Sequence, residues 1–261
     1  MAQQGFAYES NAYAALEKYN ISTGGTAGAS SDKPDLTVQR NGKTTGVELK
    51  LSPTAAGSLV MKYVNGKWDY GDVGTDPEKI FLRALGEKFK LLTQMNSSGS
   101  AGQKWRGKVP YLQNEPNGKK KIVGAATKQE AYQKDLLQFG ASNEVHIIVP
   151  ASAICDYYLT KKCSYINVGT HGFYLLNQTD ALNLNDSLAK LRQRPIPSFA
   201  NSASAKIRVR CQYKGSGDYQ FVMTLQFGTV AKSPYNLAPL QGTASIDTNR
   251  LDKDPLIKAF I

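Results

Sequence analysis

Hydrophobic and polar residues follow two different periods along this chain, and each period predicts one type of element. Apolar residues at helical spacing predict four helices, over residues 6–20, 76–95, 126–139 and 151–162. Alternation of apolar and polar residues predicts three β-hairpins, over residues 35–51, 58–71 and 205–227. Short apolar runs predict further strands, over residues 144–150, 164–169 and 172–177. Helices and strands are therefore interspersed, which is typical of an α/β fold.

The length of the chain fits one large domain or two small ones. Its 261 residues contain no internal repeat and no clear linker. We therefore expect a single domain over residues 1–261, with a core at about 5–180 and a β-rich C-terminal part at about 200–261. Residues 96–122 are rich in Gly, Ser, Asn and Lys, which predicts a long loop.

The hairpin at residues 35–51 has a register that its turn determines. Asn41-Gly42 is the preferred pair for a two-residue type I′ turn, and that turn places Asp35 opposite Glu48. Lys50 lies two residues beyond Glu48 and therefore points to the same face. The other face collects the apolar residues Leu36, Val38, Val47, Leu49 and Leu51. One face is thus expected in the core, and the other carries the charges.

Two carboxylates in facing positions repel each other, so a structural protein rarely places them there without a cation. Hard oxygen ligands suit Mg²⁺ and Mn²⁺, which bind one or two carboxylates and leave other positions to water and substrate phosphate. A neighbouring Lys can orient or deprotonate a water on the metal, or stabilise charge on the phosphate. An alternative stays open, in which Asp35 lies in the loop before a sheet edge and binds no metal.

Pro34-Asp35, twelve intervening residues and Glu48-Leu49-Lys50 resemble the motif of the PD-(D/E)xK nuclease superfamily. This superfamily includes many restriction endonucleases, archaeal-type Holliday-junction resolvases and phage exonucleases. The context is similar too, because Asp35 opens one expected strand, Glu-x-Lys lies in the next, and a helix precedes both. The segment GVELK (46–50) also resembles the mismatch-repair nicking enzyme and its restriction-enzyme relatives. The resemblance covers about residues 5–52.

The resemblance implies a restriction-endonuclease-like fold, with a mixed β-sheet core flanked by helices, and a set of catalytic roles. Asp35, Glu48 and the backbone carbonyl of Leu49 would bind Mg²⁺, for which Mn²⁺ could substitute. Lys50 would position the attacking water. In-line attack on phosphorus would leave a 5′-phosphate.

The first expected helix offers a further acidic residue. Many members of the superfamily carry a Glu on this helix after a Gly and an aromatic residue, as Gly5, Tyr8 and Glu9 do here. The resemblance implies that Glu9 is a fourth catalytic residue, which holds a second metal ion or its water shell. Independently, Glu9 shares the inward helix face with Tyr13 and Leu16, and an inward acid usually has a partner. A favourable interaction with the helix dipole is the alternative.

The net charge of +11, from 32 Lys and Arg against 21 Asp and Glu, favours a polyanionic partner. We expect DNA, in double-stranded form. Two groups could contact it: the alternating cations Lys206, Arg208 and Arg210, and the loop residues Lys104, Trp105 and Arg106. Cations at a spacing of two can follow phosphates, and a Trp among cations can wedge at a base step. Solvated surface is the alternative for both groups.

The chain has few residues that would suit histidine catalysis, disulfide bonding or zinc binding. His146 lies in an apolar run and is expected in the core, and His171 is expected to make a structural hydrogen bond in a turn. The three cysteines are too few and too irregularly spaced for a disulfide framework or a zinc site, so we expect them reduced and packed. No apolar run reaches the ~20 residues of a membrane helix, and the N-terminus lacks a signal peptide. We therefore expect no membrane partner and a cytoplasmic location.

These features together predict a Mg²⁺-dependent endonuclease that hydrolyses DNA phosphodiester bonds. A sequence-specific, restriction-type enzyme is the first choice, because much of the chain lies beyond the motif and leaves room for recognition. A Holliday-junction resolvase, a structure-selective phage-type nuclease and a non-catalytic nucleic-acid-binding protein are the alternatives. Many relatives act as dimers so that two sites cut two strands, so the resemblance also allows a homodimer.

Overall fold

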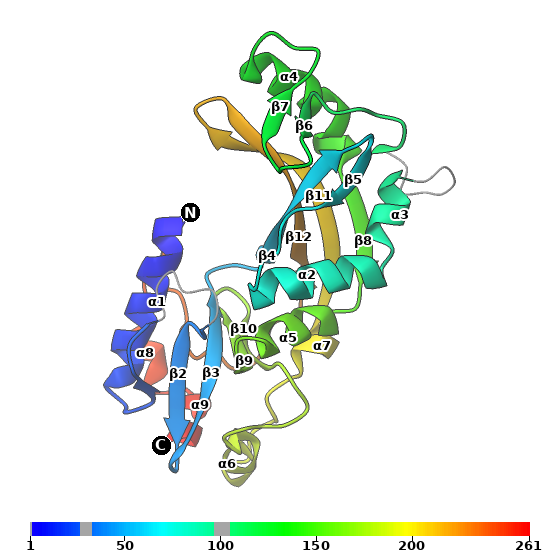
Figure 1. Ribbon diagram of the computed structural model, residues 1–261. Coiled ribbons are helices and arrows are strands. Elements are labelled where there is room, and N and C mark those ends of the chain that lie inside the picture. The colour runs from blue at the N-terminus through cyan, green and yellow to red at the C-terminus, as the bar shows by residue number, and fades with distance from the viewer. Residues whose placement is uncertain (1, 27–32, 97–104) are drawn as a thin grey trace. The chain divides into compact units, whose positions relative to one another are not determined.

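The chain divides into two compact units in the computed structural model, which describes residues 2–26, 33–96 and 105–261 (Figure 1). Unit 1 comprises Met1–Thr54, Pro150–Ser204 and Phe227–Ile261, and unit 2 comprises Ala55–Val149 and Ala205–Gln226. These boundaries differ from the expected parts at 5–180 and 200–261, because each unit is built from segments that are distant in sequence. The mixed α/β class is confirmed, while folding as a single domain stays a prediction.

Unit 1 is built around a mixed sheet with helices. Its elements are α1 (Ala2–Glu17), β1 (Ser22–Thr23), β2 (Leu36–Arg40), β3 (Lys43–Lys50), α5 (Ser152–Leu159), β9 (Cys163–Val168), β10 (Gly172–Leu175), α6 (Leu184–Lys190), α7 (Phe199–Ser202), α8 (Thr248–Leu251) and α9 (Pro255–Phe260). The strand order is β1-β2-β3-β9-β10. β3 runs antiparallel to β2 and parallel to β9, so β3 is the central strand and has a neighbour on each side.

The turn between β2 and β3 has the predicted conformation. Asn41 and Gly42 both have positive φ values, of 49° and 74°, as a type I′ turn requires. The ladder pairs Arg40 with Lys43 and continues to Leu36 and Val47. The predicted register of this hairpin is therefore confirmed over the whole of β2.

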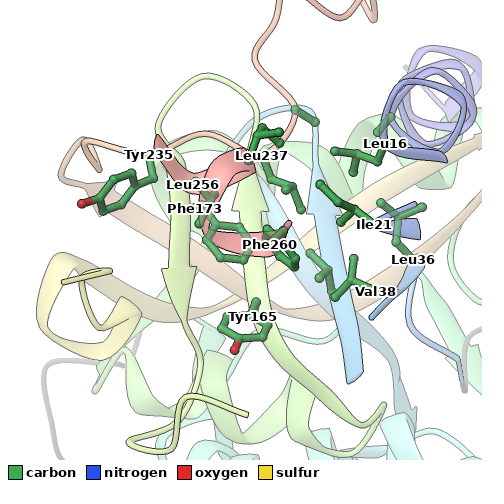
Figure 2. Packing of buried hydrophobic residues seen from close by; sticks show 14 of the residues in the cluster. Leu16, Ile21, Leu36, Val38, Tyr165, Phe173, Tyr235, Leu237, Leu256 and Phe260 are labelled. Carbon is green, nitrogen blue, oxygen red and sulfur yellow. The ribbon is translucent and has the colours of Figure 1, made fainter. Parts of the chain in front are cut away.

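The core of unit 1 confirms the predicted apolar face of the hairpin. Leu36, Val38, Val47 and Leu49 are buried in one cluster with residues of α1, β9, β10 and α9. Figure 2 shows Leu36 and Val38 beside Leu16 and Ile21, and Phe173 packed near Phe260. Full burial of an aliphatic side chain contributes about 1.5–3 kcal/mol to stability. This face of β2 and β3 therefore anchors the hairpin.

Unit 2 contains a second five-stranded sheet and a small two-stranded one. Its elements are β4 (Ala55–Val64), β5 (Lys67–Tyr70), α2 (Pro77–Lys88), α3 (Leu91–Asn96), β6 (Leu112–Asn114), β7 (Lys120–Ile122), α4 (Lys128–Phe139), the 3₁₀ turn Ala141–Asn143, β8 (Val145–Val149), β11 (Ala203–Gly215) and β12 (Asp218–Val230). The larger sheet has the order β5-β4-β12-β11-β8. The ends of β11 and β12 belong to unit 1, so two connections join the units there.

The predicted helix at 76–95 is interrupted. Asp76 caps α2 by accepting hydrogen bonds from the N–H groups of Glu78 and Lys79, and Pro77 occupies the first turn. Lys90 then takes a left-handed conformation with φ of 54°, which ends α2 and separates it from α3. Apolar residues continue at helical spacing across this break, so their periodicity alone predicted one continuous helix.

Among the described helices, none is both long enough and apolar enough to cross a membrane.

Candidate active site

Asp35 lies one residue before β2 and turns its carboxylate toward β3. Its Oδ2 accepts a hydrogen bond of 2.8 Å from the backbone N–H of Leu49, and the side chain is only 8% exposed. Asp35 therefore stands outside the strand ladder, as the alternative supposed, yet it stays beside the strand that carries Glu48. The hydrogen bond fixes where the carboxylate lies.

The backbone of Leu49 faces the same carboxylate. A residue in an extended strand directs its N–H and its C=O to the same edge. Because the Leu49 N–H points to Asp35, the carbonyl oxygen of Leu49 also points to the β2 side of β3. The carbonyl of Lys50 points the other way and accepts a hydrogen bond of 2.8 Å from the N–H of Gly169. The Leu49 carbonyl thus has the orientation that its predicted role as a metal ligand needs.

Glu48 is completely buried, and two ammonium groups face it. Lys50 Nζ lies 2.6 Å from Glu48 Oε1, and Lys161 Nζ lies 3.7 Å from Glu48 Oε2. Lys161 follows α5, at the start of the connection to β9. Both lysines also lie over the ring of Tyr158, at 5.5 and 5.8 Å from its centroid. The face predicted to carry the charges is therefore covered, and Glu48 is neutralised there.

Burial and mutual repulsion change the protonation of these groups. Burial and the charge of Glu48 raise the pKa of Asp35 to about 8, although Lys50 and the Leu49 N–H oppose this. Burial acts to lower the pKa of Lys50, but the charges of Glu48 and Asp35 outweigh burial and raise it. Lys50 is therefore a firmly protonated ammonium, and Asp35 is a carboxyl group that would ionise more readily beside an added cation.

Glu9 lies on α1 within electrostatic range of this group. Burial raises the pKa of Glu9, and the charges of Lys50, Glu48 and Lys161 all act on it. Among the described residues, however, no three His, Cys, Asp or Glu side chains converge closely enough to hold one metal ion. Both predicted roles of Glu9, holding a second metal ion or its water shell, stay predictions.

Lys161 is the residue of this site that the sequence did not reveal. The stretch 151–162 was predicted as a helix, and Lys161 falls near its end, where a basic residue commonly complements the helix dipole. Its position beside Glu48 depends on the parallel pairing of β3 with β9, which brings the end of α5 against β3. No local pattern signals that pairing.

The predicted cation row on β11 exists, but its central member is already paired. Lys206, Arg208 and Arg210 are half-buried on one face, and Ile207 and Val209 are buried on the other. Arg208 donates two hydrogen bonds, of 2.6 and 2.5 Å, to the carboxylate of Glu144. The predicted contacts of this row with DNA stay predictions, and Arg208 would have to exchange Glu144 for a phosphate to make one.

Trp105 lies in the core of unit 2, which corrects its predicted contact with a base. It is 1% exposed, and its ring centroid lies 4.9 Å from that of Trp68 in a tilted contact and 4.8 Å from that of Phe139 in an edge-to-face contact. Its indole N–H donates a hydrogen bond to the carbonyl of Asn143. Its ring thus has no face left for a nucleic acid. Arg106 is exposed, and Lys104 lies outside the described residues.

The two histidines differ from each other. His146 is exposed on β8 and lies 3.3 Å from Glu144, so its predicted place in the core is wrong. Its strand is apolar, but the side chain falls on the outer face. His171 lies in the turn between β9 and β10, where its Nδ1 is 2.7 Å from the hydroxyl of Thr170. The cysteines Cys155, Cys163 and Cys211 are buried free thiols, as predicted.

Comparison of the chain with known protein families, with curated proteins and with solved structures finds no match. The geometry around Asp35, Glu48 and Lys50 is therefore the main guide to function.

Proposed function

We propose that this protein is a Mg²⁺-dependent endonuclease that hydrolyses phosphodiester bonds of double-stranded DNA. The observation that carries the proposal is the pair of buried carboxylates, Asp35 and Glu48, beside the ammonium group of Lys50. Burying two acids side by side costs free energy that a divalent cation would offset. The restriction-endonuclease-like core implied by the motif is part of the same proposal.

The donor atoms suit a hard cation. Two carboxylates and the carbonyl of Leu49 supply oxygen ligands, and Mg²⁺ commonly takes one or two carboxylates and completes its shell with water and phosphate. When bound, the ion would lower the pKa of a water ligand and offset charge on the phosphate. Mn²⁺ has the same preference for oxygen and should replace Mg²⁺.

Lys50 has a defined part in the proposed reaction. Since its pKa is raised, its ammonium group stays protonated and can orient the attacking water and stabilise the phosphate oxygens. Removal of a proton from water by Lys50 is correspondingly disfavoured. The oxygen of water forms a bond to phosphorus as the bond from phosphorus to the 3′ oxygen breaks. The attacking water gives a proton to solvent, the departing 3′ oxygen takes one from solvent, and the products are a 3′-hydroxyl and a 5′-phosphate.

The net charge of +11 supports DNA as the substrate. Sequence-specific cleavage is proposed first, because unit 2 adds a second folded unit to the one that holds the site, and such a unit can read a sequence. Cleavage directed by a junction or another DNA structure is the runner-up.

The first experiment incubates supercoiled plasmid with the protein in Mg²⁺, and in EDTA as the control. We expect nicked and linear plasmid in Mg²⁺ alone. Genomic DNA then separates the substrate classes, because a sequence-specific enzyme gives discrete bands and an unspecific enzyme gives a smear. A synthetic cruciform tests the structure-selective alternative. Binding of all these DNAs without cleavage would instead indicate a non-catalytic binding protein.

The matched variants are Asp35→Ala and Lys50→Ala. Each should lower the cleavage rate by at least about 10³-fold, which corresponds to about 4 kcal/mol in the barrier. Circular dichroism would verify that both variants are folded. Cleavage at the native rate by both folded variants would contradict the assignment of the site.

A further inference from the structure

A cavity of about 530 Å³ lies on the face of the β2–β3 hairpin that also carries Glu48. Its wall is formed by lysines, threonines, a proline and a glycine, namely Lys33, Pro34, Thr37, Thr44, Thr45, Gly46, Lys161 and Lys162. None of these lining residues is acidic. Three ammonium groups and three hydroxyl groups are donors that bind phosphate oxygens.

The backbone at Gly46 places this cavity next to the candidate active site. Gly46 lies two residues before Glu48 on β3, so about 7 Å separates their Cα atoms and both face the same side. Lys161 belongs to both places, since it lines the cavity and its ammonium lies 3.7 Å from Glu48. The cavity therefore adjoins the candidate site, and Lys161 is the residue that they share.

The segments on both sides of Gly46 carry a lysine. A Cβ atom on Gly46 would lie 2.6 Å from Pro34 and 2.9 Å from the carbonyl oxygen of Lys162, so glycine is needed for this close approach. The N–H of Gly46 donates to that carbonyl at 3.3 Å. Lys33 precedes Pro34 on one side, and Lys162 stands on the other. Both lysines are exposed, so two solvent-accessible cations flank Gly46, which is itself buried against Pro34 and the backbone of Lys162.

We infer that this cavity, which we call the lysine track, binds the phosphodiester backbone of the DNA strand beside the phosphate that is cut. The inference rests on the proposed function for its place next to the scissile bond. The lysines contact phosphates by charge, and the hydroxyl groups of Thr37 and Thr44, which share the face of Glu48, add hydrogen bonds. Such contacts position a strand without reading its sequence.

Another cavity of unit 1, of about 930 Å³, offers a contrast. Its lining carries Lys232, Arg250 and Lys253 but also Asp247 and Asp254. Cations and carboxylates in one wall give no clear preference for a polyanion. The lysine track has a single sign of charge and shares Lys161 with the candidate site, and these two features favour phosphate as its ligand.

The test measures binding of a fluorescein-labelled 20-base-pair DNA duplex in EDTA, by fluorescence anisotropy at several salt concentrations. The variant Lys33→Gln/Lys162→Asn removes both exposed cations of the track. Asparagine is chosen at position 162 because Lys162 has φ of 61°, and Asn tolerates this conformation. The control is Lys18→Gln/Lys190→Gln, which removes two exposed lysines elsewhere in unit 1.

We expect the track variant to bind about 10-fold more weakly and its salt dependence to flatten by about 2 in the logarithmic slope. The control should stay near the native protein. Equal effects of the two double variants, native affinity in the track variant, or no binding by the native protein would each overturn the inference. Because no cleavage occurs in EDTA, this result is independent of the plasmid assay. A protein that binds through the track but never cuts would refute the endonuclease proposal alone.

Discussion

Two β-hairpins of this molecule carry alternating charged residues, and their charges have different surroundings. In the β2–β3 hairpin of unit 1, the charged face holds the buried acid Glu48 with Lys50 and Lys161 around it. In the β11–β12 hairpin of unit 2, the charged face holds half-buried cations, and Arg208 is held by Glu144. The first arrangement adds a second buried acid, Asp35, beside an acid that already has two cations, whereas the second is an ordinary ion pair.

The difference shows what alternation can and cannot indicate. Alternation determines which residues share a face, and in both hairpins it did so correctly. The neighbouring strand or helix then decides whether a charge is buried, paired or solvated. Burial beside a like charge stores electrostatic free energy that a cation or a phosphate can use, and a satisfied ion pair does not.

The largest expected difference is between two Glu→Gln variants, one at Glu48 in the first hairpin and one at Glu144 beside the second. Glu48→Gln should lower plasmid cleavage by at least about 10³-fold, or about 4 kcal/mol, because one carboxylate of the proposed metal site is lost. Glu144→Gln should leave the cleavage rate within about 3-fold of native, or about 0.7 kcal/mol. Cleavage rates at saturating Mg²⁺ provide the measurement. Equal losses in the two variants would remove the distinction between the hairpins.

An intermediate effect is expected at Lys161, which we regard as a positioning residue for Glu48. Lys161→Met removes one of the two ammonium groups beside that carboxylate and should lower kcat by about 10–100-fold, or about 1.4–2.7 kcal/mol. Lys161→Arg keeps the charge and should restore part of the rate. Single-turnover cleavage distinguishes these variants. If Arg fails to improve on Met although both proteins are folded, the charge of Lys161 has no part in the reaction.

The last expected effect concerns the stability of the second hairpin and not the cleavage rate. Arg208→Ala leaves the poorly exposed carboxylate of Glu144 without its bidentate partner, at a cost of about 1–3 kcal/mol. Denaturant unfolding would measure this loss, and Lys206→Ala, on the same face, is the control with little expected change. If Arg208→Ala keeps native stability but weakens DNA binding at every salt concentration, Arg208 serves the nucleic acid rather than Glu144.

Local signals in the sequence were enough to predict the hairpin of the candidate site. Asn41-Gly42 determines a turn, the turn determines the register, and the register places Asp35 near Glu48 and Lys50. Local residue types also account for the cap at Asp76 and for the turn at Asn65-Gly66, where Val64 pairs with Lys67. These features depend on neighbours in sequence, which a pattern can contain.

The features that the sequence did not give depend on distant neighbours. Trp105 lies among lysines in a polar stretch, yet Trp68, Phe139 and Phe221 bury it from other parts of unit 2. Lys161 reaches Glu48 only because β9 pairs with β3. His146 has apolar neighbours in sequence, and its exposure follows from the side of the sheet on which it falls. In each case tertiary pairing outweighs local composition.

The place of β3 between β2 and β9 also determines when the candidate site forms during synthesis. The hairpin leaves the ribosome long before α5 and β9, because all of residues 55–149 are made in between. Until β9 arrives, one edge of β3 is open. Pairing between such distant segments is a slow step in folding. The nascent chain therefore carries the acids of the hairpin before it carries the residues that cover them, and Glu48 is enclosed only after β9 has paired with β3.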